Sequence, residues 1–211
     1  MKKIGVAIHA IDNFNVDIIK GLKDIDYIHV DVMDGKFVNN TNLNLEAFRI
    51  LKEYTKIPII VHLMVLNPFD YIEKIIKFID VFLFHFESDG DKLTIINKIK
   101  KYDKEVGIVL NPDTGLSEII PYFSVLDYVL LMSVYPGWSG QKFIPETIKK
   151  VNKLAEYRKK YNFKIIVDGG VNCENARELI NVDILSSSST ILNAENPNFI
   201  IQSLKESGIN D

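Results

Sequence analysis

Residues 27–35 read Tyr27-Ile28-His29-Val30-Asp31-Val32-Met33-Asp34-Gly35. The first six form a short run rich in β-branched residues, and similar runs recur along the whole chain of 211 residues. The runs are Ile4–Ile8, Tyr27–Val32, Ile59–Val65, Val81–Phe86, Val106–Leu110, Tyr128–Val134, Lys164–Val167 and Ile184–Ser187. Most are almost continuously apolar, which is typical of strands that are covered on both faces.

Lys- and Glu-rich segments with helical spacing separate these runs. The segments are Pro68–Ile76, for which Asn67 is the predicted cap, Pro145–Lys159, Asn175–Ile180 and Asn198–Leu204. Alternating strands and helices predict a parallel α/β sheet. Eight repeats without a linker favour a closed (β/α)₈ TIM barrel, a single domain over residues 1–211, although an open doubly wound sheet is the structural alternative. No dinucleotide-binding fingerprint follows the first run.

Composition narrows the class of function. The chain is 47% hydrophobic and 25% charged, with a net charge of −3. Lys and acidic residues are interleaved, so neither nucleic acid nor a membrane surface is an expected partner. The apolar run at the start is short, contains His9 and meets Asp12, so we expect a strand and no signal peptide. The lone Cys173 excludes an internal disulfide and suits the cytoplasm, where we expect the protein to be.

Polar side chains interrupt three of the predicted strands. Side chains alternate between the faces of a strand, so His29, Asp31 and Met33 point the same way. His62 lies in the third run and Asp168 ends the seventh. Each alone has a plain structural explanation, such as a hydrogen-bonded core pair. Because barrel enzymes carry their chemistry at the carboxyl ends of strands, the two imidazoles and two carboxylates together suggest a site for Zn²⁺, Fe²⁺, Mn²⁺ or Co²⁺.

Glycine and serine follow the sixth, seventh and eighth strands. They occur in Pro136-Gly137-Trp138-Ser139-Gly140, in Gly169-Gly170 and in Ser186-Ser187-Ser188-Ser189. Backbone amides in such loops bind phosphate, and barrels often bind it after strands seven and eight. The structural alternatives are an ordinary strand-to-helix turn and a solvated loop.

Several segments together resemble the ribulose-phosphate 3-epimerase family, in its order and spacing, over essentially the whole chain. They are His29-Val30-Asp31-Val32-Met33-Asp34-Gly35-Lys36-Phe37-Val38, Val61-His62-Leu63-Met64-Val65, Leu110-Asn111-Pro112-Asp113-Thr114, Pro136-Gly137-Trp138-Ser139-Gly140-Gln141-Lys142-Phe143 and Val167-Asp168-Gly169-Gly170-Val171-Asn172.

The resemblance implies an isomerase: a homo-oligomeric TIM-barrel epimerase of the pentose phosphate pathway with one divalent metal ion. The implied activity is 3-epimerisation of a phosphorylated ketose, D-ribulose 5-phosphate to D-xylulose 5-phosphate, through a metal-stabilised enediolate. The implied ligands are His29, Asp31, His62 and Asp168, and the implied proton-transfer acids are Asp31 and Asp168. The implied substrate-binding residues are Met33, Met64, Met132, Gly137, Gly140, Gly169, Gly170, Ser188 and Ser189.

The rim of the expected site departs from the family pattern. Val6-Ala7 replaces a usual Pro-Ser pair, Lys36-Phe37-Val38-Asn39-Asn40 replaces His-Phe-Val-Pro-Asn, Tyr135 replaces Asn, and Ser188-Ser189 replaces Gly-Ser. This pattern predicts retained chemistry and leaves the identity of the substrate open. His9 has no assigned role, and His85 is expected to support the site or to pack in the core.

Three alternatives remain. The first is an epimerase of allulose 6-phosphate or of a surface-carbohydrate precursor, and the second is a non-catalytic sugar-phosphate binder. The third, the orotidine-phosphate decarboxylase group, would need Lys where Met33 stands.

Overall fold

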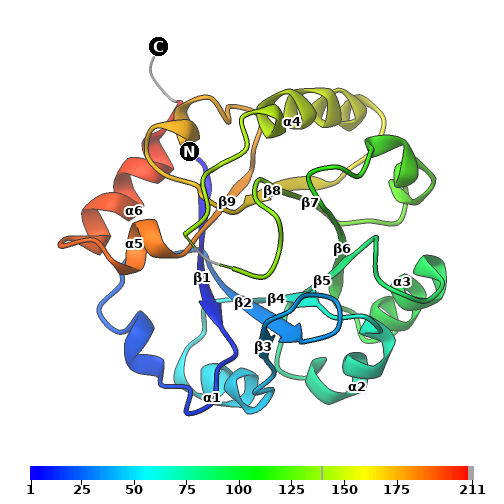
Figure 1. Cartoon of the computed structure of the whole chain (residues 1–211), viewed down its shortest axis with the longest axis horizontal. Helices are drawn as coiled ribbons and strands as arrows, with labels where there is room; N and C mark the ends of the chain where they lie inside the picture. Colours follow the sequence, from blue (N-terminus) through cyan, green and yellow to red (C-terminus); the bar gives the residue numbers. More distant parts are fainter. Residues whose placement is uncertain (139, 209–211) are drawn as a thin grey trace.

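A ring of eight parallel strands forms the centre of the protein, in a computed structural model that describes residues 1–138 and 140–208 (Figure 1). Ser139 of the predicted phosphate loop and residues 209–211 of the predicted domain lie outside the described residues. The ring consists of β1 (Lys3–His9), β2 (Tyr27–Asp34), β4 (Ile59–Met64), β5 (Val81–His85), β6 (Glu105–Leu110), β7 (Tyr128–Met132), β8 (Lys164–Asp168) and β9 (Ile184–Ser187). Pairing of β1 with both β2 and β9 closes it. The predicted TIM barrel is therefore confirmed.

Helices surround the ring in Figure 1. They are α1 (Glu46–Tyr54), α2 (Ile72–Ile75), α3 (Lys92–Lys100), α4 (Glu146–Glu156), α5 (Ser189–Leu192) and α6 (Pro197–Glu206). Short 3₁₀ turns cover Val16–Ile19, Pro68–Tyr71, Leu116–Glu118, Ile120–Tyr122, Tyr157–Lys159 and Asn175–Arg177. Within the described part of the chain, every helix is too short or too polar to span a bilayer.

Two local predictions were wrong, and one strand was not predicted. The segment Pro68–Ile76 is divided into a 3₁₀ turn and α2, and the side chain of Asn67 donates to Asp70 instead of capping the turn. Asn175–Ile180 forms only one 3₁₀ turn, because the side chain of Asn175 is engaged by the backbone before it. The strand β3 (Thr41–Asn42), antiparallel to β2, was not predicted, since two residues are too few to show a period.

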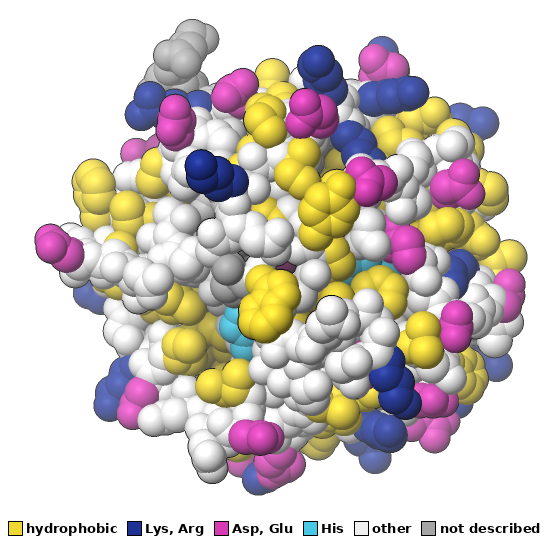
Figure 2. Space-filling view, viewed as in Figure 1, with side chains coloured by type: hydrophobic (Ala, Val, Ile, Leu, Met, Phe, Trp, Pro, Cys, Tyr) yellow, Lys and Arg dark blue, Asp and Glu magenta, His cyan; other side chains and the backbone are white. Residues whose placement is uncertain are grey.

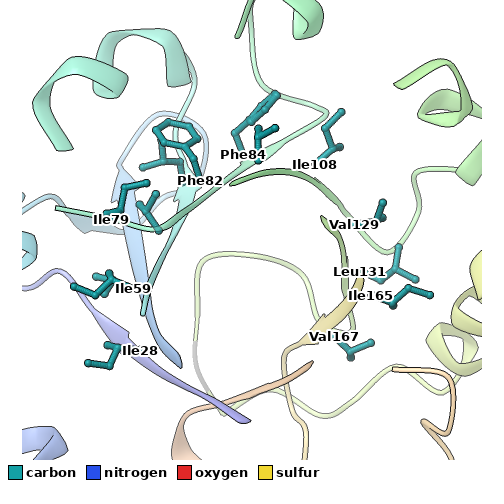
Figure 3. Close-up of a cluster of buried hydrophobic side chains, with 14 of the residues drawn as sticks. Ile28, Ile59, Ile79, Phe82, Phe84, Ile108, Val129, Leu131, Ile165 and Val167 are labelled. Carbon is teal, nitrogen blue, oxygen red and sulfur yellow. The ribbon is translucent and has the colours of Figure 1, made fainter. Parts of the chain in front are cut away.

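Alternation along the strands divides the core in two. One set of side chains packs between the strands and the helices, and Figure 3 labels ten of its members outside the ring. The other set fills the inside of the barrel and includes Tyr27, Ile60, Leu130 and Ile166. Because alternate residues share a face, Tyr27 inside the barrel places the side chains two and four residues later inside as well. The strand pattern alone therefore aims the polar side chains of β2 at the barrel axis.

Candidate active site

Four polar side chains meet at the carboxyl ends of the strands. They are His29 and Asp31 on β2, His62 on β4 and Asp168 on β8. Asp31 and His62 are register partners across neighbouring strands, and the curvature of the ring brings Asp168 to them. One ligand atom from each of the four lies within 4.8 Å of all the others, and all four residues are buried. The structure thus brings together every residue of the predicted metal set.

One nitrogen of each imidazole faces the two carboxylates. Nδ1 of His62 lies 2.9 Å from Oδ1 of Asp31 and 3.5 Å from Oδ2 of Asp168. Nε2 of His29 lies 3.2 Å and 3.7 Å from the same two oxygens. Bonds of about 2.0–2.1 Å to a tetrahedral Zn²⁺ place ligand atoms about 3.3 Å apart, and the four imidazole–carboxylate distances lie close to that value.

The ring of His29 supplies independent support for a cation. It is fully buried, and neither of its nitrogens has a hydrogen-bond partner of acceptable geometry in the part of the chain that the structure describes. A buried polar group left without a partner costs about 1–3 kcal/mol. A cation at the centre of the cluster would be the missing partner of Nε2. The donor set therefore fits a divalent first-row metal.

Burial and charge act against each other in this cluster. Burial raises the pKa of Asp31, but the neighbouring imidazoles of His29 and His62 outweigh it and hold that pKa below its usual range. Burial lowers the pKa of His62, but the carboxylates of Asp168 and Asp31 outweigh it and raise that pKa to about 9. In the metal-free protein, His62 therefore carries a proton at neutral pH on the side that faces the carboxylates.

Metal affinity should consequently rise with pH. A metal ligand must be deprotonated, so a cation has to displace the proton on Nδ1 of His62. With the pKa of His62 at about 9, we expect the apparent affinity to increase about tenfold per pH unit from pH 7 toward that value. Titration of the metal-free protein with Zn²⁺ against a competing chelator at several pH values measures this slope. An affinity independent of pH over that range would contradict the assignment.

A pocket of about 550 Å³, its open mouth included, lies above the four side chains. In Figure 2, hydrophobic side chains and histidine surround the hollow at the centre of this face. Asp31 and Asp168 line the pocket, whereas His29 and His62 lie beneath it. The carboxylates can thus contact both a cation and a ligand in the pocket, while the imidazoles can contact only the cation.

The other residues named from the sequence line the same pocket. They are Met33, Met64, Met132, Gly137, Gly140, Gly169, Gly170, Ser188 and Ser189. Ser186, which belongs to the serine segment predicted to bind phosphate, also lines the pocket, and its buried hydroxyl has no hydrogen-bond partner among the described residues. It follows Leu185 on β9, so strand parity places it inside the barrel, a signal that the sequence did contain.

Comparison with known proteins decides the family. The model of the ribulose-phosphate 3 epimerase family matches residues 6–192. The chain belongs to the ribulose-phosphate 3-epimerase family. The resemblance seen in the sequence is therefore confirmed, and the family is one of carbohydrate isomerases.

Named relatives span most of the chain. The ribulose-phosphate 3-epimerase of Methanocaldococcus jannaschii is 35% identical over 99% of this chain and 92% of that protein. The cytoplasmic isoform from Oryza sativa is also 35% identical, over 86% of this chain and 82% of its own length. Among solved structures, 3-keto-L-gulonate-6-phosphate decarboxylase from Vibrio cholerae has a TM-score of 0.72 at 11% identity, covering 99% of this chain and 97% of that one. At that identity the likeness shows the fold alone.

The pocket rim includes residues at which the sequence was predicted to depart from the family pattern. Ala7 stands in the wall without a hydroxyl, and His9 lines the pocket with Nδ1 3.3 Å from the side-chain amide of Asn42. The exposed Tyr135 donates its hydroxyl to Asp113 at 2.8 Å. The predicted rim residues therefore lie in the same pocket as the two carboxylates of the predicted metal set.

Gly170 supports the floor of the predicted phosphate loop. Its φ is +62°, and a Cβ there would lie 2.8 Å from the backbone oxygen of Gln141 and from the backbone nitrogen of Phe143. Gly21 has φ +81° with open space around it. Alanine at either position adopts a left-handed backbone conformation, which costs about 1–2 kcal/mol. We expect Gly170→Ala to lose more stability than Gly21→Ala, because its Cβ also clashes with backbone, and to weaken phosphate binding. Urea unfolding and inorganic phosphate titration compare the two variants; equal losses in both would contradict the close packing.

Proposed function

We propose that this protein is a divalent-metal-dependent 3-epimerase of a ketose phosphate, with D-ribulose 5-phosphate and D-xylulose 5-phosphate as its substrate pair. One observation carries the proposal: Asp31 and Asp168 come from strands separated in the ring by β1 and β9, yet they line the floor of one pocket. Two carboxylates that approach a ligand from different strands are what inversion of a carbon needs, because one removes a proton and the other returns one to the opposite face.

Epimerisation also needs stabilisation of the negative charge on the sugar, and residues of this chain can hold the cation that supplies it. His29 and His62, fully buried beneath the pocket, contribute only to the cation site. The cation, when bound, supplies Lewis-acid stabilisation of the negative charge that develops on the sugar oxygens.

The methionines Met33, Met64 and Met132, each at most 4% exposed, surround the reacting carbon with an apolar wall. This wall excludes water and offers no competing proton.

The phosphate of the ketose is placed at the glycine and serine loops. Gly137 and Gly169 have positive φ values, which lets backbone approach a ligand without an intervening Cβ. The hydroxyls of Ser187 and Thr190 are both bound to the carbonyl of Val171, which fixes the loop that carries Ser188. A cytoplasmic location and a homo-oligomeric state remain predictions, as does a place in the pentose phosphate pathway.

The rim favours a second candidate within the same chemistry. Ala7 and Tyr135, two of the positions at which the sequence is predicted to depart from the family pattern, both line the pocket. An epimerase of allulose 6-phosphate, or of a precursor of surface carbohydrate, would use the same two carboxylates with a different set of contacts at the pocket rim. A non-catalytic binder would have no need of two carboxylates in the pocket.

Proton exchange with solvent tests the proposal directly. The metal-loaded protein is incubated in D₂O with ribulose 5-phosphate and, separately, with allulose 6-phosphate, and deuterium at C3 is measured by mass spectrometry. Faster exchange into ribulose 5-phosphate supports the first candidate, and faster exchange into allulose 6-phosphate supports the second. Absence of exchange into both, with metal bound, would overturn the proposed function.

A further inference from the structure

A chain of polar contacts leads sideways from the cation site to the loops that follow β5 and β6. Nε2 of His62 lies 2.9 Å from Nε2 of His85 on β5, and Nδ1 of His85 lies 3.3 Å from Oε2 of Glu87. His85 is fully buried, and the planes of the two imidazoles are inclined by only 23°. His85 and Glu87 are absent from the pocket wall and from the metal-binding set, so they can act on that set only through His62.

Hydrogen-bond rules fix the direction of this chain. Glu87 is a carboxylate, which only accepts, so Nδ1 of His85 must donate to it. When Nδ1 of a neutral imidazole carries the proton, Nε2 is an acceptor, so Nε2 of His62 must donate to His85. A neutral His62 protonated at Nε2 presents the lone pair of Nδ1. That is the nitrogen that faces Asp31 and Asp168.

Glu87 is itself held in place. Its Oε1 accepts a hydrogen bond from the backbone nitrogen of Asn111 at 2.9 Å and a short one from the hydroxyl of Thr114. These donors, together with His85, outweigh burial and lower the pKa of Glu87 to about 2. The segment Asn111–Thr114 is one of those that resemble the family, and the sequence assigned it no role. Its hydrogen bonds to the carboxylate of Glu87 are a role that fits it.

We propose that Glu87 and His85 are positioning residues that fix the tautomer and orientation of His62, so that Nδ1 of His62 is presented to the divalent cation. The inference rests on the proposed function only for the presence of that cation. The same hydrogen-bond pattern exists before the cation arrives, because loss of the proton on Nδ1 leaves the Nε2 bond to His85 unchanged. The ring of His62 is therefore already held in the orientation and tautomer that bind the metal before the metal arrives.

In the variant Glu87→Gln, neither orientation of the new amide can keep all the hydrogen bonds that Glu87 makes. If the amide nitrogen of the new side chain donates to His85, the tautomer of His85 reverses, and His62 must accept at Nε2 and carry its proton on Nδ1. If the amide oxygen faces His85 instead, the amide nitrogen meets the donors of Asn111 and Thr114. We expect Glu87→Gln to weaken Zn²⁺ binding about 10–100-fold, the usual effect of losing a residue that orients a metal ligand.

The experiment compares variants of the full chain. Zn²⁺ affinity is measured by chelator competition for wild type, Glu87→Gln and the control Glu105→Gln. Glu105 begins β6 at the other end of the barrel, where it accepts from Tyr128. NMR of nitrogen-labelled histidine in the Zn²⁺-loaded proteins reports which nitrogen of His62 bears the proton.

A second pair keeps the test informative if Glu87→Gln does not fold. Thr114→Val removes the hydroxyl donor to Glu87, and Thr114→Ser keeps it. We expect weakened Zn²⁺ binding in Thr114→Val, wild-type binding in Thr114→Ser and Glu105→Gln, and a proton on Nε2 of His62 in wild type.

Unchanged Zn²⁺ affinity and an unchanged His62 pattern in both Glu87→Gln and Thr114→Val would overturn the inference. Failure of the proposed function is recognised separately, since wild type would then bind Zn²⁺ and exchange no proton of either ketose phosphate.

Discussion

Asp168→Asn is expected to lower turnover of the ketose phosphate by about 10²–10⁴-fold, the contribution of proton transfer by a positioned side chain. The amide that replaces the carboxylate can neither remove nor return the proton at C3. It can still contribute an oxygen to the cation, and its size is the same, so the barrel should remain folded. Steady-state kinetics with D-ribulose 5-phosphate, at a Zn²⁺ concentration that saturates the variant, measures the loss.

The matched control is Asp127→Asn. Asp127 precedes β7 at the other end of the barrel, where its carboxylate accepts from the backbone nitrogen of Val106 and from Lys100. We expect near-wild-type turnover in this variant. Comparable turnover in Asp168→Asn and Asp127→Asn would mean that Asp168 carries no proton, and the two-carboxylate scheme would then be abandoned.

His29→Leu should remove metal-dependent activity almost completely while leaving the metal-free protein at least as stable as wild type. One of the four donors is lost, so we expect Zn²⁺ affinity to fall by more than the roughly 10–100-fold that loss of a supporting residue costs. In the absence of metal, however, the variant replaces a buried ring whose nitrogens have no hydrogen-bond partner of acceptable geometry among the described residues. Relief of that penalty, about 1–3 kcal/mol, offsets the loss of the ring beside Asp31.

The two quantities measured for His29→Leu are expected to respond differently: Zn²⁺ affinity falls, whereas the stability of the metal-free protein is kept or rises. Zn²⁺ binding is followed by chelator competition, and stability is followed by urea unfolding with all metal removed. A structural histidine would give the reverse pattern, in which the metal-free variant is clearly destabilised and Zn²⁺ still binds. His62→Leu is the informative comparison, because His62 has partners on both ring nitrogens and its loss should destabilise the metal-free protein.

The barrel was predictable from the sequence because each strand is an apolar run that is buried on both faces. The ends of the strands were predicted less accurately. β7 ends at Met132, two residues before its predicted end, and β8 extends one residue further than predicted, to Asp168. Termination of a strand depends on its neighbours in the ring, which a local pattern does not contain. The helices were predicted less accurately than the strands. For example, the side chain of Asn175 bonds to nearby backbone, and the expected helix shortens to a turn.

The candidate site was predictable to the extent that it follows strand parity. His29, Asp31 and Met33 share a face by alternation alone. His62 and Asp168 stand out as polar residues within or at the end of apolar strands, and the family resemblance implied the same four ligands. The contact of His85 with His62 depends on the tilt of β5 against β4, and the bond from Asn42 to His9 depends on the unpredicted strand β3. Such contacts across the ring have no signature in one sequence.

Closure of the ring has a consequence for how the protein is made. β1 borders both β2 and β9, and β9 follows all the other strands of the ring in the chain. A ribosome therefore releases His29, Asp31 and His62 long before it releases Asp168 and the strand that seals the circle. The nascent polypeptide holds three of the predicted donors without the fourth, so the proposed metal site is complete only after the last strands of the ring have emerged.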